Sequence, residues 1–379
     1  MTNSDYFDEH KLSLIFQEFG KGGTKGTFNE IKKAFLKRAE ILNLPAQTLL
    51  QKIFINPLEA LKIWDIVALR REDSFFNYPE TFEVAGELMR EWATLSPTRS
   101  LKALILGAGR GFEAASLSME MSTQGLLIKG FDVEINSLDL SKACVDRAKS
   151  GVFTEQEVYA LGSHLLRKHL TFKRGEYYLK DTIKKLTRCY FGDPFFPSDH
   201  KILESKALEA YEGEVDILFA RSFWRDLPDD KIEAFVDSLE PLLKDGALAF
   251  LAPGEIFVPK GKLSLEERRG VFYFRKGEAK RHKNSFFAPK RRETKLSVES
   301  SHKPSPRLDQ IRKSAIMALP TEPSLAKEYA LEAIISAANE SGTYHPQDYK
   351  TLSQAEEALC RPKMAKLIME AYLLLTGEA

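Results

Sequence analysis

The sequence predicts a Rossmann-like α/β domain, with a helical domain on its N-terminal side and a helical tail on its C-terminal side. Between residues 90 and 278, short apolar runs alternate with segments of helical periodicity, which is typical of a mainly parallel sheet covered by helices. In residues 1–89 and 309–379 the apolar residues recur at three- and four-residue spacing, which indicates helices. A chain of 379 residues is long enough for two or three folded units.

The N-terminal domain, residues 1–89, is expected to consist of helices. Phe28, Ile31 and Phe35 fall on one face of a predicted helix. Pro57 stands where a proline is tolerated, near the first turn of another predicted helix.

The central domain, residues 90–278, is expected to contain the strands. Residues 101–111 read as a buried strand followed by a tight glycine turn. Residues 126–134 read as a second strand that ends in acidic residues, and residues 137–186 read as helical. Later strands are expected at CYFGDPF, VDILFARSFW, DGALAFLAP and GVFYFRKG.

The C-terminal region, residues 309–379, again shows helical periodicity. The segments SLAKEYALEAIISAA and AEEALCRPKMAKLIMEAYLLL suggest an antiparallel pair of helices, with Pro362 inside or between them. Their spacing faintly resembles a tetratricopeptide repeat, but a single unit without a visible period favours a plain helical appendage.

The charge of the chain is unevenly distributed. There are 55 Lys and Arg against 54 Asp and Glu, a net charge of +1, which argues against a uniformly basic nucleic-acid binder. Residues 279–308 nevertheless hold nine Lys and Arg and two Glu, so this segment carries +7 and the remainder −6. Because this segment also lacks periodicity, we expect a flexible basic linker that can attract phosphate, an anionic membrane or an acidic partner.

Other composition features favour a cytoplasmic protein without a metal. Cys144, Cys189 and Cys360 lie far apart and fit neither a disulfide framework nor a metal site, and the seven histidines are scattered. The N-terminus lacks the pattern of a signal peptide, and no apolar run is long enough for a transmembrane helix.

Three glycines and two acidic residues form the strongest chemical signal. Gly107, Gly109 and Gly111 follow the first predicted strand, where glycine lets the backbone turn sharply and approach a ligand. Asp132, placed at the end of the second predicted strand, suits the hydroxyls of an adenosine ribose, and Glu113 suits a charged group of the same ligand. Without a phosphate-binding lysine, this pattern favours S-adenosylmethionine over NAD or ATP. The alternative is a glycine turn beside a solvated acid.

Six short blocks occur in an order and spacing that match a known family. They are residues 72–77 (EDSFFN), 108–113 (AGRGFE), 131–134 (FDVE), 148–153 (AKSGVF), 220–222 (ARS) and 253–255 (PGE). Residues 30–278 thereby resemble the CheR-type chemotaxis receptor methyltransferases, which transfer a methyl group from S-adenosylmethionine to glutamate side chains. The resemblance implies an S-adenosylmethionine-dependent methyltransferase domain and a protein substrate, such as a chemoreceptor-like signalling protein.

The resemblance also assigns roles to individual residues. Glu113 and Asp132 would contact the methionine amino group and the ribose, and Asp193 would lie near the adenine. Arg221 and Ser222 would line the same cleft, and Asp73 replaces a threonine that contacts the cofactor.

Two departures from the family concern catalysis. Asn77 stands where the family has an arginine beside the transferred methyl group, and Asp226 stands where it has a tyrosine. A lost guanidinium and a gained carboxylate would repel a glutamate substrate, although Arg110 or Arg225 could restore positive charge. Three readings therefore stay open: a methyltransferase acting on protein carboxylates, a regulatory module that binds S-adenosylmethionine without catalysis, and a methyltransferase with another acceptor such as nucleic acid.

Overall fold

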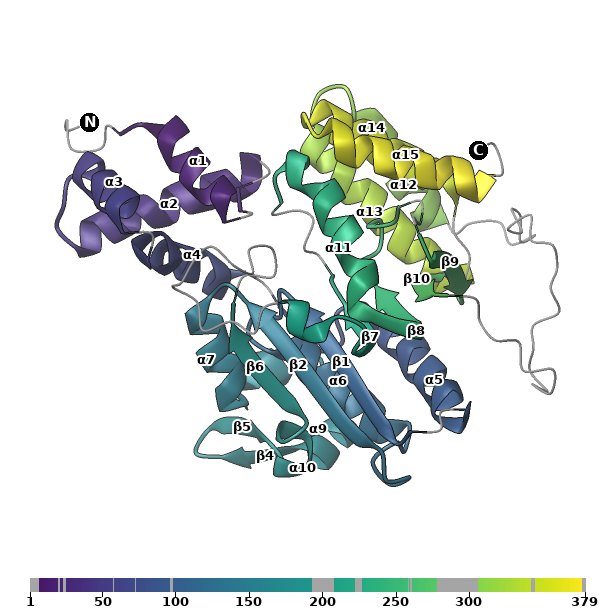
Figure 1. Cartoon of the computed structure of the whole chain (residues 1–379). Helices are drawn as coiled ribbons and strands as arrows, with labels where there is room; N and C mark the ends of the chain where they lie inside the picture. The colour runs from purple at the N-terminus through teal and green to yellow at the C-terminus, as the bar shows by residue number, and fades with distance from the viewer. Residues whose placement is uncertain are drawn as a thin grey trace. The chain divides into compact units, whose positions relative to one another are not determined.

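The computed structural model describes residues 7–19, 21–22, 25–56, 58–71, 73–95, 98–192, 208–221, 227–257, 259, 261–277, 306–341 and 345–376 (Figure 1). They belong to two compact units, Met1–Lys231 and Ile232–Ala379. In the described part of the chain, no helix combines the length and the apolar sequence that crossing a membrane requires.

The first unit begins with helices. They are α1 (Glu9–Glu18), α2 (Lys25–Ile41), α3 (Ala46–Ile55), α4 (Leu58–Arg70) and α5 (Pro79–Leu95). α1 starts at Asp8, whose carboxylate accepts a hydrogen bond of 3.0 Å from the backbone N–H of Lys11. Ile31 and Phe35 are fully buried in the core that α1 to α4 share, and Phe28 packs against this core. The predicted apolar face of α2 is therefore confirmed.

A parallel sheet forms the centre of the first unit. β1 (Ser100–Leu106), β2 (Asp132–Asp139), β6 (Thr187–Phe191) and β7 (Val215–Phe219) lie in the order β6-β2-β1-β7 and run parallel. α6 (Phe112–Thr123) follows β1, and α7 (Lys142–Ser150) follows β2. Every residue of β7 is buried, as expected for a strand covered on both faces. The Rossmann-like prediction is confirmed.

A half-buried carboxylate joins the N-terminal helices to the start of α7. Ser141 caps α7, and its hydroxyl donates a hydrogen bond of 2.6 Å to Oδ1 of Asp65 in α4. The backbone N–H of Ala143 donates to the same oxygen at 3.2 Å. Because Asp65 satisfies donors at the first turn of α7, the two elements are held in register.

A small antiparallel sheet follows α7, where the sequence analysis expected only helices. β3 (Val152–Phe153), β5 (Glu176–Leu179) and β4 (Leu170–Lys173) lie in the order β3-β5-β4, together with the short helices α8 (Glu155–Val158), α9 (Ser163–His169) and α10 (Asp181–Lys184). We call residues 152–186 the insertion subdomain. The helical expectation for residues 137–186 was wrong here, because Arg174 and Gly175 form a tight turn, with φ of +54° and +83°, that reverses the chain.

The second unit contains an antiparallel sheet. β8 (Leu243–Phe250), β10 (Val271–Lys276) and β9 (Leu263–Arg268) lie in the order β8-β10-β9, after α11 (Ile232–Leu242). The two units thus hold a parallel set of four strands and an antiparallel set of three, which matches the expected α/β class.

The C-terminal tail of the second unit is larger than the expected pair of helices. α12 (Pro306–Ala318), α13 (Pro323–Ser341), α14 (Pro346–Ala358) and α15 (Pro362–Thr376) each begin at a proline, which is tolerated in the first turn. Tyr349 of α14 meets Phe272 of β10 edge to face, with ring centroids 6.1 Å apart. A Cβ on Gly254 would lie 2.6 Å from a methyl group of Leu331, so these helices approach the backbone after β8 closely.

The expected basic linker, residues 279–308, lies mostly outside the described residues. Its last three residues, Pro306 to Leu308, form the first turn of α12. Residues 279–305 are not among those described.

An ion pair inside the C-terminal helices gives a stability prediction. Nε of Arg312 lies 2.9 Å from Oδ1 of Asp348, and Nη2 of Arg312 lies 2.9 Å from Oδ2, while the Asp348 side chain is only 3% exposed. Arg312→Met would leave this buried carboxylate unpaired, so we expect the free energy of unfolding to fall by about 3 kcal/mol in urea denaturation. The matched control is Lys366→Met, which breaks an exposed pair with Glu370 and should cost less than about 0.5 kcal/mol. Equal losses in both variants would contradict the prediction.

Candidate functional site

The candidate site is built around the glycine turn between β1 and α6. Gly107, Gly109 and Gly111 have φ of +70°, +52° and +89°, a region that favours glycine. A Cβ on Gly111 would lie 2.7 Å from the Cβ of Ala148 in α7, so this glycine also permits close packing of the turn. The predicted turn is therefore present, and all three glycines adopt the left-handed conformation.

Asp139, the last residue of β2, fixes this turn. Its Oδ2 accepts a hydrogen bond of 2.8 Å from the backbone N–H of Gly109, and its Oδ1 accepts one of 2.7 Å from Ser141. Burial raises the pKa of the Asp139 carboxyl, and the nearby Lys21 and Arg71 cations oppose this shift. A buried carboxylate thus connects the glycine turn to the start of α7.

The placement of Asp132 at the end of the second strand was wrong. β2 pairs with β1 from Ser100 opposite Asp132 to Leu106 opposite Leu138. Asp132 is therefore the first residue of β2 and lies at the opposite end of the strand from the glycine turn. Its side chain is exposed. The apolar run at residues 126–130 forms a turn instead of a strand, and Ile128 in it is 91% exposed. The acid at the carboxyl end of β2 is Asp139.

Three other residues named from the sequence come together next to this turn. Arg221, which directly follows Ala220 after β7, places its Nη1 3.1 Å from Oε1 of Glu113 in the first turn of α6. Its Nη2 donates to the backbone carbonyl of Asn77. The guanidinium also faces the rings of Tyr78 and Phe82, at 5.3 and 5.0 Å from their centroids. The Arg221 side chain is only 4% exposed, whereas that of Glu113 is 17% exposed.

Asp73 supplies a further carboxylate beside the glycine turn. A Cβ on Gly109 would lie 2.9 Å from Oδ2 of Asp73, and the backbone N–H of Arg110 donates a hydrogen bond to this carboxylate. Burial raises the pKa of Asp73 to about 6, against the opposing charge of the Arg110 guanidinium. Asp73 and Asp139 both lie next to Gly109, and Glu113 lies in the first turn of the following helix, so three acidic residues lie around the turn.

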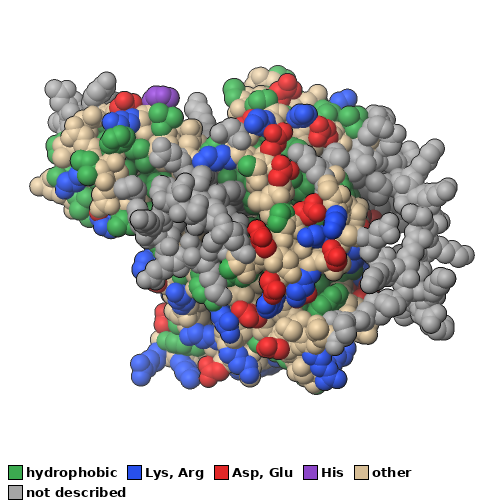
Figure 2. All heavy atoms as spheres, viewed as in Figure 1, with side chains coloured by type: hydrophobic (Ala, Val, Ile, Leu, Met, Phe, Trp, Pro, Cys, Tyr) green, Lys and Arg blue, Asp and Glu red, His purple; other side chains and the backbone are tan. Residues whose placement is uncertain are grey.

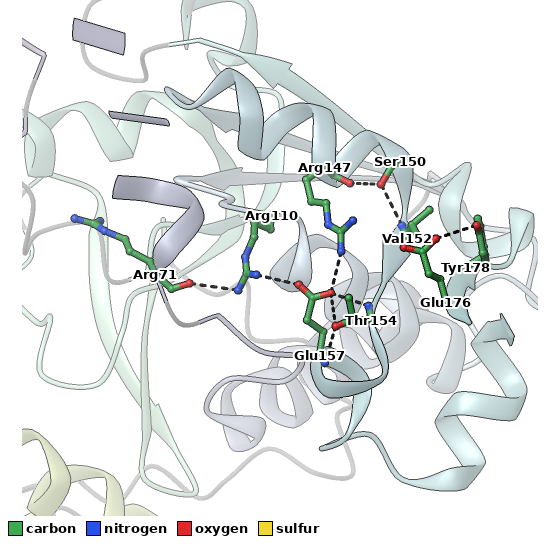
Figure 3. A network of polar contacts seen from close by, with 9 residues as sticks. All are labelled: Arg71, Arg110, Arg147, Ser150, Val152, Thr154, Glu157, Glu176 and Tyr178. Atoms are coloured by element: carbon green, nitrogen blue, oxygen red, sulfur yellow. Dashed lines mark hydrogen bonds and ion pairs between the residues drawn. The ribbon is translucent and has the colours of Figure 1, made fainter. Parts of the chain in front are cut away.

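Arg110, inside the glycine turn, is engaged by the insertion subdomain (Figure 3). Its Nη1 lies 2.9 Å from Oε1 of Glu157, and its Nη2 donates to the carbonyl of Arg71 at 3.3 Å. Nη2 of Arg147 lies 3.1 Å from the other oxygen of Glu157. Glu157 also completes a capping box with Thr154 at the start of α8. Arg110 therefore balances the charge of Glu157. It does not take the place of the family arginine that this chain lacks at position 77.

Several residues named from the sequence lie outside the described residues. They are Asp193, Ser222, Arg225 and Asp226. Sequence reasoning also missed Asp139 and Glu157. An Asp followed two residues later by a helix-capping Ser was the available signal for Asp139, whereas Glu157 gave none because its contact with Arg110 spans 47 residues.

Comparison with known proteins gives one family match. A family model described as CheR methyltransferase, SAM binding domain, matches residues 71–267, just over half of the chain. No curated protein matches the chain.

Several solved methyltransferase structures also match, at low similarity. Phosphoethanolamine N-methyltransferase 1 of Haemonchus contortus, in complex with phosphoethanolamine and S-adenosylhomocysteine, is 13% identical over 51% of this chain and 31% of that chain, with a TM-score of 0.26. A SAM-dependent methyltransferase from Aquifex aeolicus is 11% identical over 54% and 97%, with a TM-score of 0.25. The plantazolicin methyltransferase BpumL, in complex with SAH, is 12% identical over 86% and 76%, with a TM-score of 0.26. Against some of the matched structures the chain spans from 31% to 62% of their length.

The cofactor is S-adenosylmethionine, because the matched domain binds it. The residues present fit this ligand. It carries a sulfonium and an ammonium group, and the turn is lined by the carboxylates of Asp73, Glu113 and Asp139. The positive φ values of the glycines let the backbone approach a ligand. Among the described residues, no group of three or more His, Cys, Asp and Glu is placed to hold a metal ion.

The raised pKa of Asp73 gives a prediction on the ligand-free protein. The pKa is about 6 in the folded state against an ordinary value of 3.8, so the folded state favours the protonated carboxyl. The corresponding stabilisation is present below about pH 4 and is lost as the pH rises through 6. Asp73→Asn stays neutral, so at pH 7.5 it should unfold with a free energy up to about 3 kcal/mol higher than wild type.

Urea denaturation at pH 4 and pH 7.5 measures this difference. At pH 4 the variant and wild type should be nearly equal. Asp132→Asn is the control, because it changes an exposed aspartate at the far end of β2 and should alter stability little at either pH. A difference between Asp73→Asn and wild type that is the same at both pH values would refute the assignment.

Proposed function

We propose, because the chain belongs to the CheR methyltransferase family, that it is an S-adenosylmethionine-dependent methyltransferase acting on glutamate carboxylates of a protein partner, such as a chemoreceptor-like signalling protein. The observation that carries this proposal is the Arg221–Glu113 pair beside the glycine turn. When bound, S-adenosylmethionine supplies an electrophilic methyl group.

The acidic residues have distinct roles in this proposal. Glu113, oriented by Arg221, receives the ammonium group of the cofactor. Asp139 takes the ribose role given above to Asp132, because it stands at the carboxyl end of β2 beside Gly109. Asp73 adds negative charge on the other side of Gly109. Asp193 and Ser222 keep the cofactor roles implied by the resemblance.

The acceptor needs positioning more than proton transfer. A glutamate carboxylate is already anionic at neutral pH, so the chain has to hold it in line and offset its charge. Asn77 offers no charge at the position of the family's arginine, and its carbonyl is bound by Arg221. The Arg221 guanidinium is itself paired with Glu113. We therefore expect methyl transfer to be slow.

The same observation favours a second candidate. A domain that keeps Glu113 and Arg221 but lacks the arginine at position 77 suits a regulatory module that binds S-adenosylmethionine without turnover. Residues Asn77 and Asp226 motivate this alternative, and the two candidates differ only in whether methyl transfer occurs.

Cofactor affinity tests the assignment of Asp139 over Asp132. Isothermal titration calorimetry with S-adenosylmethionine should show at least a tenfold loss for Asp139→Asn, because a hydrogen bond to a charged group contributes about 1.5–3 kcal/mol. The matched variant Asp132→Asn should bind like wild type, since its side chain lies at the far end of β2. Glu113→Gln changes a less buried side chain and is therefore less prone to a folding defect. Its affinity for S-adenosylmethionine should also fall about tenfold. Unchanged affinity in both Asp139→Asn and Glu113→Gln would remove the proposed cofactor site.

Methyl transfer is tested with tritiated S-adenosylmethionine and a purified cytoplasmic fragment of a chemoreceptor. Wild type should slowly form methyl esters on the fragment, which release tritiated methanol when the product is treated with base. Asn77→Arg should raise this rate about tenfold or more by returning a cation to the site, whereas Asn77→Gln should not. If neither wild type nor Asn77→Arg forms a methyl ester although both bind the cofactor, the proposed activity is wrong and the regulatory module is favoured.

A further inference from the structure

The part of the insertion subdomain that begins at α9, together with the start of β6, carries a concentrated positive charge. Residues 163–188 contain eight Lys and Arg and two acidic residues, a net charge of +6, so the rest of the chain carries −5. We define the basic face by seven of these cations, which come from α9, β4, the turn after β4, and the β5–α10 region. They are Arg167, Lys168, Lys173, Arg174, Lys180, Lys184 and Lys185. Figure 2 shows Lys and Arg side chains gathered at the lower part of the view, where Figure 1 places these elements.

The cations of the basic face are not held in ion pairs, and Lys168 acts on the Glu120 carboxylate only through space. No described carboxylate forms an ion pair with any of the seven cations, whereas the eighth, Arg188, pairs with Glu134. Lys180 and Lys184 donate hydrogen bonds of 2.6 and 2.8 Å to backbone carbonyls, which orients the ammonium groups without neutralising them. Glu176 stands opposite Lys173 in the hairpin, but its carboxylate accepts a hydrogen bond of 3.2 Å from Tyr178.

An exposed aromatic ring stands next to two of these cations in the chain, at the tip of the β4–β5 hairpin. Phe172 is 60% exposed and precedes Lys173 and Arg174 at the tip of the β4–β5 hairpin. The two-residue turn makes this tip short and stiff. One side of the Phe172 ring contacts the ring of Tyr177, with centroids 4.9 Å apart. Exposing such a ring to water is unfavourable, and an aromatic ring next to cations is typical of a surface that meets the polar boundary of a bilayer.

We propose that the basic face docks on an anionic lipid bilayer, with Phe172 entering the headgroup region and the lysines and arginines contacting the anionic headgroups. Each cation near such a surface contributes about fivefold to the affinity. Outside this segment (+6) and the basic linker (+7) the chain carries −12, which the same surface repels, so binding would also orient the protein.

A single-stranded nucleic acid is the main competing partner. Such a ligand needs a groove that follows the backbone and open aromatic faces on which bases stack. Phe172 instead stands at a projecting turn and already uses one face against Tyr177. The observations therefore favour a lipid surface. This proposal concerns a surface apart from the glycine turn and does not depend on catalysis.

Co-sedimentation of the full chain with vesicles tests the proposal. At 50 mM salt the protein should bind vesicles containing 30% phosphatidylglycerol and not vesicles of phosphatidylcholine alone, and 500 mM salt should abolish binding. Lys173→Glu with Arg174→Glu should lower the affinity about 30-fold or more, because two cations are lost and reversed. Phe172→Ser should weaken binding at both low and intermediate salt. All variants should keep wild-type affinity for S-adenosylmethionine, which shows that they are folded.

Two comparison variants make the result specific. Lys52→Glu with Lys313→Glu changes the net charge equally at exposed positions elsewhere and should bind vesicles like wild type. Neutralising Lys290, Arg291 and Arg292 of the basic linker to Ser measures the contribution of that segment. The proposal is overturned if the Lys173/Arg174 variant binds like wild type, if the Lys52/Lys313 variant loses as much, or if only the linker variant loses binding. It is also overturned if a 20-nucleotide single strand displaces the protein from the vesicles and binds more tightly than they do.

Discussion

The candidate site depends on the hydrogen bonds that the buried Asp139 carboxylate accepts from Gly109 and Ser141. The backbone N–H groups of Gly107 and Ala108 donate to the carbonyl of Leu138 in β2, whereas the N–H of Gly109 is satisfied by a side chain. Asp139 does this for the glycine turn and for the start of α7 together. The cost is a buried carboxylate whose pKa is raised, and Lys21 and Arg71 offset part of that cost. The Asp139 carboxylate therefore fixes the backbone of the turn and also contributes to the negative charge of the site.

The site also draws on segments far apart in the chain. Asp65 from the N-terminal helices caps α7, Asp73 lies over Gly109, and Glu157 from the insertion subdomain holds Arg110. Each contact reaches the glycine turn or its neighbouring helix through a charged or capping group. The N-terminal helices and the insertion subdomain thus both help to fix the glycine turn and the helix beside it.

The sequence predicts the parts of the site whose signals are local. The glycine turn needs three residues of one type after an apolar strand, and Glu113 and Arg221 follow from blocks of fixed spacing. Asp139 was not predicted, because β2 contains the buried polar residues Asn136 and Ser137, whereas the apolar run before it resembles a strand more closely. The β4–β5 hairpin was not predicted, because it lies in a lysine-rich segment whose residue spacing is typical of a helix. The Arg110–Glu157 pair depends on tertiary packing, which no local pattern encodes.

The close approach of Leu331 to Gly254 has a consequence for how the chain is divided. The second unit contains α11 and three strands of the central domain together with all four C-terminal helices. A chain cut at the basic linker would lose the C-terminal helices that pack on β10 and on the turn at Gly254. We therefore expect the remaining part of the second unit to expose apolar surface and not to fold on its own. The C-terminal helices are therefore an obligate part of the folded core of the second unit.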